Sequence, residues 1–188
     1  MRNKIIIVVL AASLLIVYFF FVNEYQAQSI EEALDLTNPS VDEIIHIEAL
    51  EGSYFAVSKR SDYLHAALVN KLFGRYKTMY SGVHGDIEIV AEVFGVTDSY
   101  FPGIKYASKP LLYGVIGNSE ISKLELFNTE SNEVIKIDII EKDGFRLWIK
   151  SLKNTADIGY ILKGYNETGI ELISRKLKFK PREIKSTY

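Results

Sequence analysis

Cysteine is absent from this chain, and its absence excludes several kinds of chemistry and of covalent support. Without a thiol the protein has no disulfide bond, no thiolate metal site, no cysteine nucleophile and no lipid-modified cysteine after an export signal. A domain that folds outside the cytoplasm would therefore depend on packing alone.

Sequence motifs of the common enzyme classes are missing as well. The chain contains no G-x-S-x-G, S-x-x-K or H-E-x-x-H motif and no glycine-rich phosphate loop. Its three histidines, His46, His65 and His84, lack the i, i+2 or i, i+4 spacing that would bring two imidazoles to one metal. The sequence thus predicts no catalytic residue, no metal site and no cofactor, and it favours a protein that is not an enzyme.

Neither sign of charge dominates, since 22 basic residues stand against 24 acidic ones, and no nucleic-acid partner is expected. With 48% hydrophobic residues, the 188-residue chain can bury one ordinary core or two small lobes. A long apolar run from Ile5 to Val22 carries no charged residue. As a helix, this run would nearly cross a hydrocarbon layer of ~30 Å.

Two interpretations compete for this run: an uncleaved membrane anchor and a cleaved signal peptide. A signal peptide has an apolar region of about 7–15 residues followed by small residues at the cleavage site. Here the run ends in the bulky residues of "YFFFV", and cleavage after Ala27 would put Tyr25 where a small residue is needed. The anchor is therefore favoured. Arg2 and Lys4 precede it, which predicts a single-pass protein of the cell membrane whose C-terminal domain is extracytoplasmic.

A short helix is predicted after the anchor. In "SIEEALDLTNPS", Ser29 fits an N-cap, Glu32 fits its capping-box partner and Asn38-Pro39 ends the helix. This helix would be a spacer that lifts the domain off the membrane. Its apolar stripe, which includes Ile30 and Leu34, would face either the domain or the bilayer surface.

From residue 41 onward the apolar residues follow the two-residue period of β-strands. The segments predicted as strands are "IIHIEAL", "SYFAVSKR", "YLHAALVNKL", "RYKTMYS", "DIEIVAEV", "LLYGVI", "ISKLELF", "EVIKIDII", "GFRLWIK", "IGYILKGY" and "GIELISRKLKFK". A helix is the main alternative for "YLHAALVNKL", because neither proline nor glycine interrupts it. Turn residues between most segments, such as Glu167 to Gly169, indicate antiparallel pairing. The proline-containing segment "DSYFPGIKYASKP" is predicted to be a connection between lobes.

The fold class that follows is mainly β, antiparallel, and either sandwich-like or divided into two small β lobes, behind one N-terminal transmembrane helix. The expected organisation is an anchor over residues 1–25, a helical spacer over 26–40, a first β lobe over 41–104 and a second over 105–188. The second lobe would end in a basic edge, because "RKLKFKPREIK" carries six basic residues and one acidic residue.

One glycine-rich stretch raises a functional question. In "YSGVHGD", Gly82 and Gly85 bracket His84, which predicts a hairpin loop with His84 as an exposed turn residue. The alternative is an envelope hydrolase in which a nearby carboxylate, such as Asp86 or Glu88, orients His84 as a general base. The turn is favoured, because no nucleophile motif lies nearby.

A candidate binding surface lies in "GFRLWIK". If Phe145, Leu147 and Ile149 face inward, then Arg146, Trp148 and Lys150 share the opposite face. An exposed tryptophan between two cations would suit a partner protein, a glycan or an anionic polymer. The alternative is that a second sheet covers Trp148.

The segments "KLFGRYKTMYSGVHGD", "LLYGVIGNSEISKLEL" and "RLWIK" together resemble a loosely defined set of small uncharacterised exported or membrane-anchored proteins of Gram-positive bacteria. The resemblance implies a bacterial cell-surface location and carries no catalytic residues. The sequence therefore predicts an extracytoplasmic β-rich binding or interaction module of the bacterial envelope. Its expected contacts are the membrane and an envelope protein or anionic polymer.

Overall fold

A computed structural model describes residues 2–24, 27–37, 41–86, 95–101, 109–142, 144–152 and 159–177. Several predictions lie outside these residues: the helix stop at Asn38-Pro39, the strand over 87–93, the connection over 102–108 and the basic residues over 178–185. In the described part the chain is mainly antiparallel β-structure, as predicted, and its strands form three sheets.

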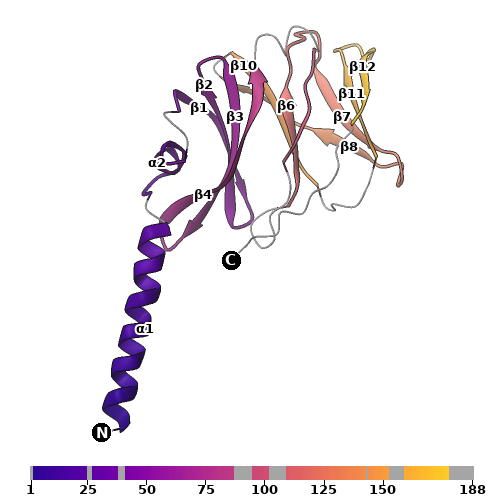
Figure 1. Ribbon diagram of the computed structural model, residues 1–188. Helices are drawn as coiled ribbons and strands as arrows, with labels where there is room; N and C mark the ends of the chain where they lie inside the picture. The colour runs from indigo at the N-terminus through magenta and orange to yellow at the C-terminus, as the bar shows by residue number, and fades with distance from the viewer. Residues whose placement is uncertain are drawn as a thin grey trace.

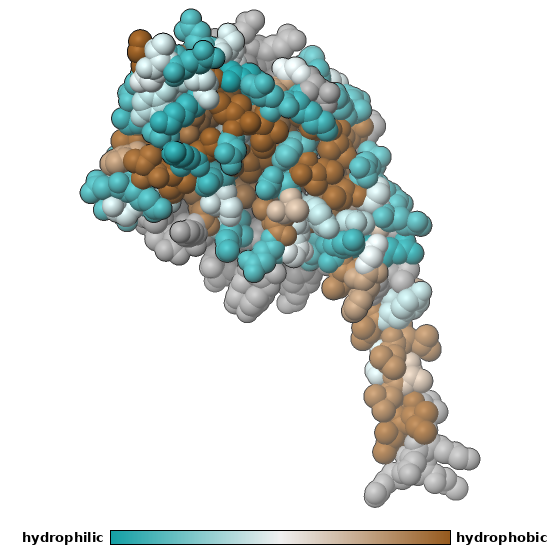
Figure 2. All heavy atoms as spheres, turned by 180° about the vertical axis from the view of Figure 1, so that it is seen from behind, coloured by the Kyte–Doolittle hydropathy of each residue, from teal (hydrophilic) through white to brown (hydrophobic). Residues whose placement is uncertain are grey.

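The N-terminal apolar run is helical, and α1 spans Arg2–Glu24. The apolar side chains described along α1 are exposed, Tyr18 and Phe19 each at 66%, and Figure 2 shows α1 as a mostly brown column that projects away from the domain. Across the ranges given above, no helix is both long enough and apolar enough to cross a membrane. The prediction of a helix is thus confirmed, whereas its assignment as a membrane span is not supported.

The first sheet is a meander of consecutive strands. Its strands are β1 (Glu43–Leu50), β2 (Ser53–Arg60), β3 (Tyr63–Leu72) and β4 (Arg75–Asp86), and they lie side by side in sequence order. Each neighbouring pair is antiparallel. The segment "YLHAALVNKL" is therefore a strand, and the helical alternative is wrong.

The chain passes back and forth between the other two sheets, so neither sheet is built only from consecutive strands. The middle sheet has the order β5-β6-β10-β9, and the outer sheet has the order β12-β11-β7-β8. The strands of the middle sheet are β5 (Ser99–Phe101), β6 (Leu111–Val115), β9 (Ile139–Lys142) and β10 (Phe145–Ser151). Those of the outer sheet are β7 (Lys123–Asn128), β8 (Val134–Ile137), β11 (Tyr160–Tyr165) and β12 (Glu171–Lys176).

The chain passes from the outer to the middle sheet at Asp138. The sequence "EVIKIDII" was predicted to be one strand, but β8 ends at Ile137 and β9 begins at Ile139 in a different sheet. The prediction failed because apolar alternation continues through the corner. Periodicity reports which face a side chain takes and does not report which sheet the strand joins.

The elements form layers in the order α2, first sheet, middle sheet and outer sheet (Figure 1). Large apolar side chains fill the space between the first and middle sheets: Ile45, Phe55, Val57, Leu64, Leu68, Phe101, Leu111, Tyr113, Val115 and Leu147. A second set fills the space between the middle and outer sheets: Leu112, Leu124, Leu126, Ile137, Trp148, Tyr160 and Leu162.

Burial on both faces explains the composition of β6, an inner strand of the middle sheet. All five residues of β6 are buried, whereas β7 and β11 alternate between buried and partly exposed positions. A strand covered on both sides needs apolar residues throughout, and one with a solvent face does not. The middle sheet also joins the two predicted lobes, since β5 comes from the range 41–104 and pairs with β6 from the range 105–188.

The second helix, α2 (Ile30–Asp35), packs on the domain. Ser29 caps it, because the Ser29 side chain accepts a hydrogen bond from the Glu32 N–H at 3.1 Å. Ala33 and Leu34 are buried against the first sheet, and the Thr78 hydroxyl donates to the Ala33 carbonyl at 2.7 Å. The predicted Ser29 cap is confirmed, whereas the Glu32 carboxylate accepts the Gln28 N–H at 2.5 Å rather than the Ser29 N–H of a capping box. The apolar stripe of the helix faces the domain, which was one of its two expected positions.

Gly114 of β6 lies very close to the segment that contains Thr97. It lies opposite Trp148 in the register of β6 and β10. A Cβ atom on Gly114 would lie 2.0 Å from the Thr97 carbonyl oxygen and 2.6 Å from Trp148 Nε1. The Trp148 indole donates a hydrogen bond to that same carbonyl at 3.0 Å, so any side chain at Gly114 would break it.

We therefore expect Gly114→Ala to lower the free energy of unfolding by about 3 kcal/mol, because it combines overpacking with loss of a buried hydrogen bond. Gly82→Ala is the matched control: Gly82 also lies in a strand, but its Cβ would meet no atom within 4 Å and its φ is outside the left-handed range. Urea denaturation of the two variants checks the difference. Equal losses would contradict the close approach at Gly114.

Candidate functional site

The three predicted binding residues lie on one face of β10, and that face is turned toward the outer sheet. Trp148 is 0% exposed and is packed between the middle and outer sheets. The prediction of an exposed Trp148 contact is therefore wrong, and the alternative of a covering sheet is correct. Alternation had assigned the face correctly, but it could not show that a third layer covers that face.

Arg146 and Lys150 lie two positions on either side of Trp148 and line two separate pockets. The Lys150 ammonium donates to the Lys136 carbonyl at 3.1 Å. The pocket near Lys150 has a volume of ≈ 660 Å³ and includes Glu130, Glu133 and Tyr160. Of the three predicted binding residues, Trp148 is thus a buried core residue, whereas Arg146 and Lys150 each line a different pocket.

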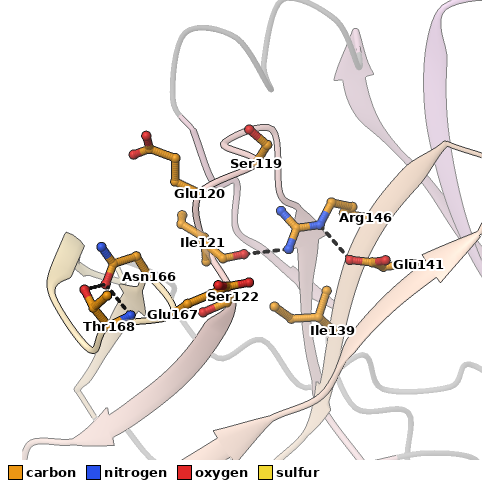
Figure 3. A pocket seen from close by; sticks show the side chains of 10 residues that line it. All are labelled: Ser119, Glu120, Ile121, Ser122, Ile139, Glu141, Arg146, Asn166, Glu167 and Thr168. Atoms are coloured by element: carbon orange, nitrogen blue, oxygen red, sulfur yellow. Dashed lines mark hydrogen bonds and ion pairs between the residues drawn. The ribbon is translucent and has the colours of Figure 1, made fainter.

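The Arg146 side chain forms three hydrogen bonds, and Figure 3 shows those to Glu141 and Ile121. Nε donates to Glu141 Oε1 at 3.0 Å, Nη1 to the Asn118 carbonyl at 3.1 Å, and Nη2 to the Ile121 carbonyl at 2.5 Å. Its charge is therefore already matched by a carboxylate and two backbone dipoles. Arg146 fixes the wall of the pocket and is poorly suited to capture a free anion.

The pocket beside Arg146 has a volume of ≈ 630 Å³ and a lining that is slightly more polar than apolar. Three segments supply its wall: the turn before β7, strands β9 and β10, and the turn between β11 and β12. The lining residues are Ser119, Glu120, Ile121, Ser122, Ile139, Glu141, Arg146, Asn166, Glu167 and Thr168. We call this the seam pocket, because it opens where the middle and outer sheets meet.

Hydrogen bonds within the turn between β11 and β12 stabilise one wall of the seam pocket. Asn166 Oδ1 accepts hydrogen bonds from the Thr168 N–H at 3.1 Å and from the Ile170 N–H at 2.8 Å. Gly169 completes that turn with φ +84°, a backbone angle that glycine adopts without strain. The sequence had predicted this turn from Glu167 to Gly169, but no pattern in the sequence brought it next to Arg146.

Carboxylates outnumber cations in the seam pocket. Glu141 pairs with Arg146, while Glu120 and Glu167 contribute two further negative charges to the lining. Hydroxyl and amide groups supply the remaining hydrogen-bonding capacity. The arrangement favours a neutral ligand rich in hydroxyl or amide groups over an anionic one.

His84 lies within β4 and is not a turn residue, so that prediction is wrong. Leu64 pairs with Gly85 and His65 pairs with Val83, which leaves His84 as the extra residue of a β-bulge. Gly85 has φ +119°, so the glycine-rich sequence does require an unusual backbone angle, but inside a strand. A bulge redirects a side chain, and here the imidazole packs against the Tyr113 ring of the middle sheet.

Two hydroxyl groups hold the His84 ring. Nε2 lies 2.7 Å from Thr97 Oγ1, and Nδ1 is hydrogen-bonded with Ser99 Oγ. A neutral imidazole has one donor and one acceptor nitrogen, and hydroxyls can satisfy both. Burial lowers the pKa of His84, and the charge of Asp98 opposes this by a smaller amount. Burial also raises the pKa of Tyr113 to about 12, so both rings are neutral near pH 7.

The carboxylates of the hydrolase hypothesis are not seen beside His84. Glu88 and the Asp86 side chain lie outside what the structure describes. The carboxylate whose charge reaches His84 is that of Asp98, which pairs with Arg175 at 3.0 Å. Among the described residues no group of three metal-ligating side chains comes together.

Thr97 and Ser99 supply the two hydroxyl groups that contact the His84 ring, and the sequence did not predict these contacts. They flank Asp98, where "DSYFPGIKYASKP" had been predicted to begin a connection between lobes. No motif links these hydroxyls to His84, which lies more than ten residues earlier in the chain. A pattern limited to one segment cannot identify partners that only the stacking of two sheets brings together.

Comparisons of this chain with protein-family models, with curated proteins and with solved structures found no match. The resemblance to Gram-positive surface proteins therefore remains a prediction.

The lowered pKa of His84 has a consequence for stability. Because the folded pKa lies below the unfolded value of 6.5, the unfolded chain binds more protons, and stability should fall as the pH drops below about 6.5. We expect urea unfolding midpoints to decrease from roughly pH 7 to roughly pH 5 in the wild type. His84→Gln, which cannot titrate, should flatten this dependence.

His65→Gln is the matched control for that measurement. The pKa of His65 is also lowered by burial and by Arg60, but its side chain is a separate contributor. The His65 variant should retain the larger part of the pH dependence. If the two variants behave alike, the hydroxyl-held His84 ring is not the main titrating group.

Proposed function

We propose that this protein is a single-pass, membrane-anchored binding module of a bacterial cell envelope, with its β-domain on the extracytoplasmic side. The seam pocket would bind a hydroxyl-rich and amide-rich polymer, such as the glycan of the cell wall. The observation that carries the proposal is the polar lining of that pocket, in which the one cation is already neutralised by its neighbours.

The anchor part of the proposal is supported by the sequence and exposure of α1. The run from Ile5 to Val22 is free of charge, and its described side chains are exposed rather than packed on the domain. Such a surface is unfavourable in water and favourable in lipid. Arg2 and Lys4 precede the run and would remain on the cytoplasmic side.

The choice of ligand rests on the charges of the seam pocket. Glu120 and Glu167 would repel an anionic polymer, whereas sugar hydroxyl and acetamido groups can donate to carboxylates and accept from hydroxyls. The hydrolase alternative has weaker support, because both nitrogens of His84 are engaged by hydroxyls and its ring lies between two sheets. A binding role requires no histidine that acts as a general base.

The membrane anchor makes a direct prediction. The full chain should remain in the membrane fraction after an alkaline carbonate wash, and mass spectrometry should find its original N-terminus. A double variant, Leu14→Lys with Val17→Lys, places two charges in the middle of α1 at a cost of about 3 kcal/mol each in a bilayer. It should be released into the supernatant. A mature chain beginning near Gln28 would contradict the anchor.

Glycan binding makes a second prediction. The purified full chain is titrated with soluble cell-wall glycan fragments in a calorimeter, and the wild type should bind them. Ser122→Tyr should weaken this binding by about tenfold or more, because the tyrosine ring would fill the seam pocket. Ser122 is exposed at the pocket wall.

Ser174→Tyr is the control for this variant, because Ser174 is an exposed residue of β12 in the outer sheet and does not line the seam pocket. It should bind the fragments as the wild type does. Equal affinity in the Ser122 and Ser174 variants would exclude the seam pocket as the binding site, and no binding in the wild type would exclude the glycan.

A further inference from the structure

The turn between β3 and β4 has an unusual residue at its tip. Leu72 pairs with Arg75 across the hairpin, which leaves Phe73 and Gly74 as the two-residue loop. Both have positive φ angles, +47° for Phe73 and +79° for Gly74. A two-residue loop with two positive φ angles is a type I′ turn, in which asparagine, aspartate or glycine is normally found first.

Phe73 is unfavourable at this position for two separate reasons. A bulky side chain is strained in the left-handed region, where only glycine and small polar residues are common. Its ring is also 87% exposed, so burial within this chain contributes little to offset the strain. An outlier of this kind points to a function outside the fold.

The residues around Phe73 share two properties. Leu72 is 41% exposed and extends the apolar tip. The sequence "KLFGRYK" carries three basic residues, Lys71, Arg75 and Lys77, and no acidic one. An apolar tip flanked by cations is the composition that favours the surface of a bilayer with anionic headgroups.

The hairpin tip also lies next to the end of α1. The Tyr76 N–H donates to the Ala27 carbonyl at 3.0 Å, which ties the chain just after α1 to the first residues of β4. Phe73 is three residues from Tyr76 and Glu24 is three residues from Ala27, and each step is at most ~3.5 Å long. Figure 1 shows this turn at the end of the domain where α1 joins it.

We propose that the β3–β4 hairpin tip, with Phe73 and Leu72 at its apex, inserts into the headgroup region of an anionic phospholipid bilayer. The proposal rests on the proposed anchor, because α1 brings this end of the domain to the membrane. The hairpin would then be a second contact that fixes the orientation of the domain and leaves the outer sheet and its seam pocket facing away from α1.

The absence of cysteine allows a direct test in the full chain. Single cysteines are introduced by Leu72→Cys at the tip, Leu14→Cys in α1 and Ile170→Cys in the β11–β12 turn of the outer sheet, and each is labelled with an environment-sensitive fluorophore. Ile170 is a matched control because it is an apolar turn residue exposed at 61%. The proteins are reconstituted in phosphatidylcholine–phosphatidylglycerol vesicles that contain spin-labelled lipids.

Headgroup-level spin labels should quench the probe at position 72 at least about twofold more than the probe at position 170. Adding Phe73→Asn to the Leu72→Cys protein should abolish most of this difference. Asparagine tolerates the same backbone angle, so the thermal midpoint should not fall. A probe at 72 that is quenched no more than the probe at 170 would overturn the proposal.

Two further measurements distinguish failure of the hairpin contact from failure of the proposed α1 anchor on which it rests. The probe at position 14 reports on α1 alone: deep spin labels that quench it support the anchor, and failure to quench it overturns the anchor whatever happens at position 72. Quenching at 14 without quenching at 72 overturns only the hairpin contact. Equal quenching at 72 in vesicles of phosphatidylcholine alone would overturn the role given to anionic headgroups.

Discussion

Thr97 connects the layers of this protein more directly than any large apolar residue does. Its carbonyl accepts the Trp148 indole N–H, and its hydroxyl accepts the Val115 N–H at 2.8 Å and meets the His84 ring of the first sheet. Its own N–H donates to the Val115 carbonyl at 2.9 Å. One small, buried residue thus satisfies polar groups from two sheets. Buried polar groups of this kind are costly unless every one is paired.

The close approach at Thr97 determines what its neighbours can be. Gly114 must lack a side chain for the Thr97 carbonyl to reach Trp148, and His84 must leave the regular ladder in a bulge to reach the Thr97 hydroxyl. Apolar packing on either side then fills the remaining volume. The hydrophobic layers supply most of the stability in such a domain, but the hydrogen bonds at Thr97 specify how the first and middle sheets are aligned.

Much of the fold could be predicted from the sequence because strand periodicity is a local property. The antiparallel β class, the strand at Tyr63–Leu72, the Ser29 cap and the turn at Glu167–Gly169 all follow from neighbouring residues. The burial of Trp148 and the environment of His84 depend on which sheet lies opposite. Apolar alternation is the same whether a face meets water or another sheet, provided that a few large residues occupy it. For this reason the candidate site could be predicted only in part, with Arg146 at a pocket wall but Trp148 in the core.

The order of strands along the chain has a kinetic consequence. The first sheet is built from successive hairpins, so its contacts are close in sequence. The middle and outer sheets instead pair β6 with β10 and β7 with β11, which requires long stretches of chain to be ordered together. Local pairings form faster than distant ones at comparable stability. During synthesis from the N-terminus, the first sheet can therefore close early, whereas the other two sheets must wait for nearly the whole chain. Until then, the apolar face of the first sheet, with Phe55, Leu64 and Leu68, lacks the middle sheet that covers it in the folded protein.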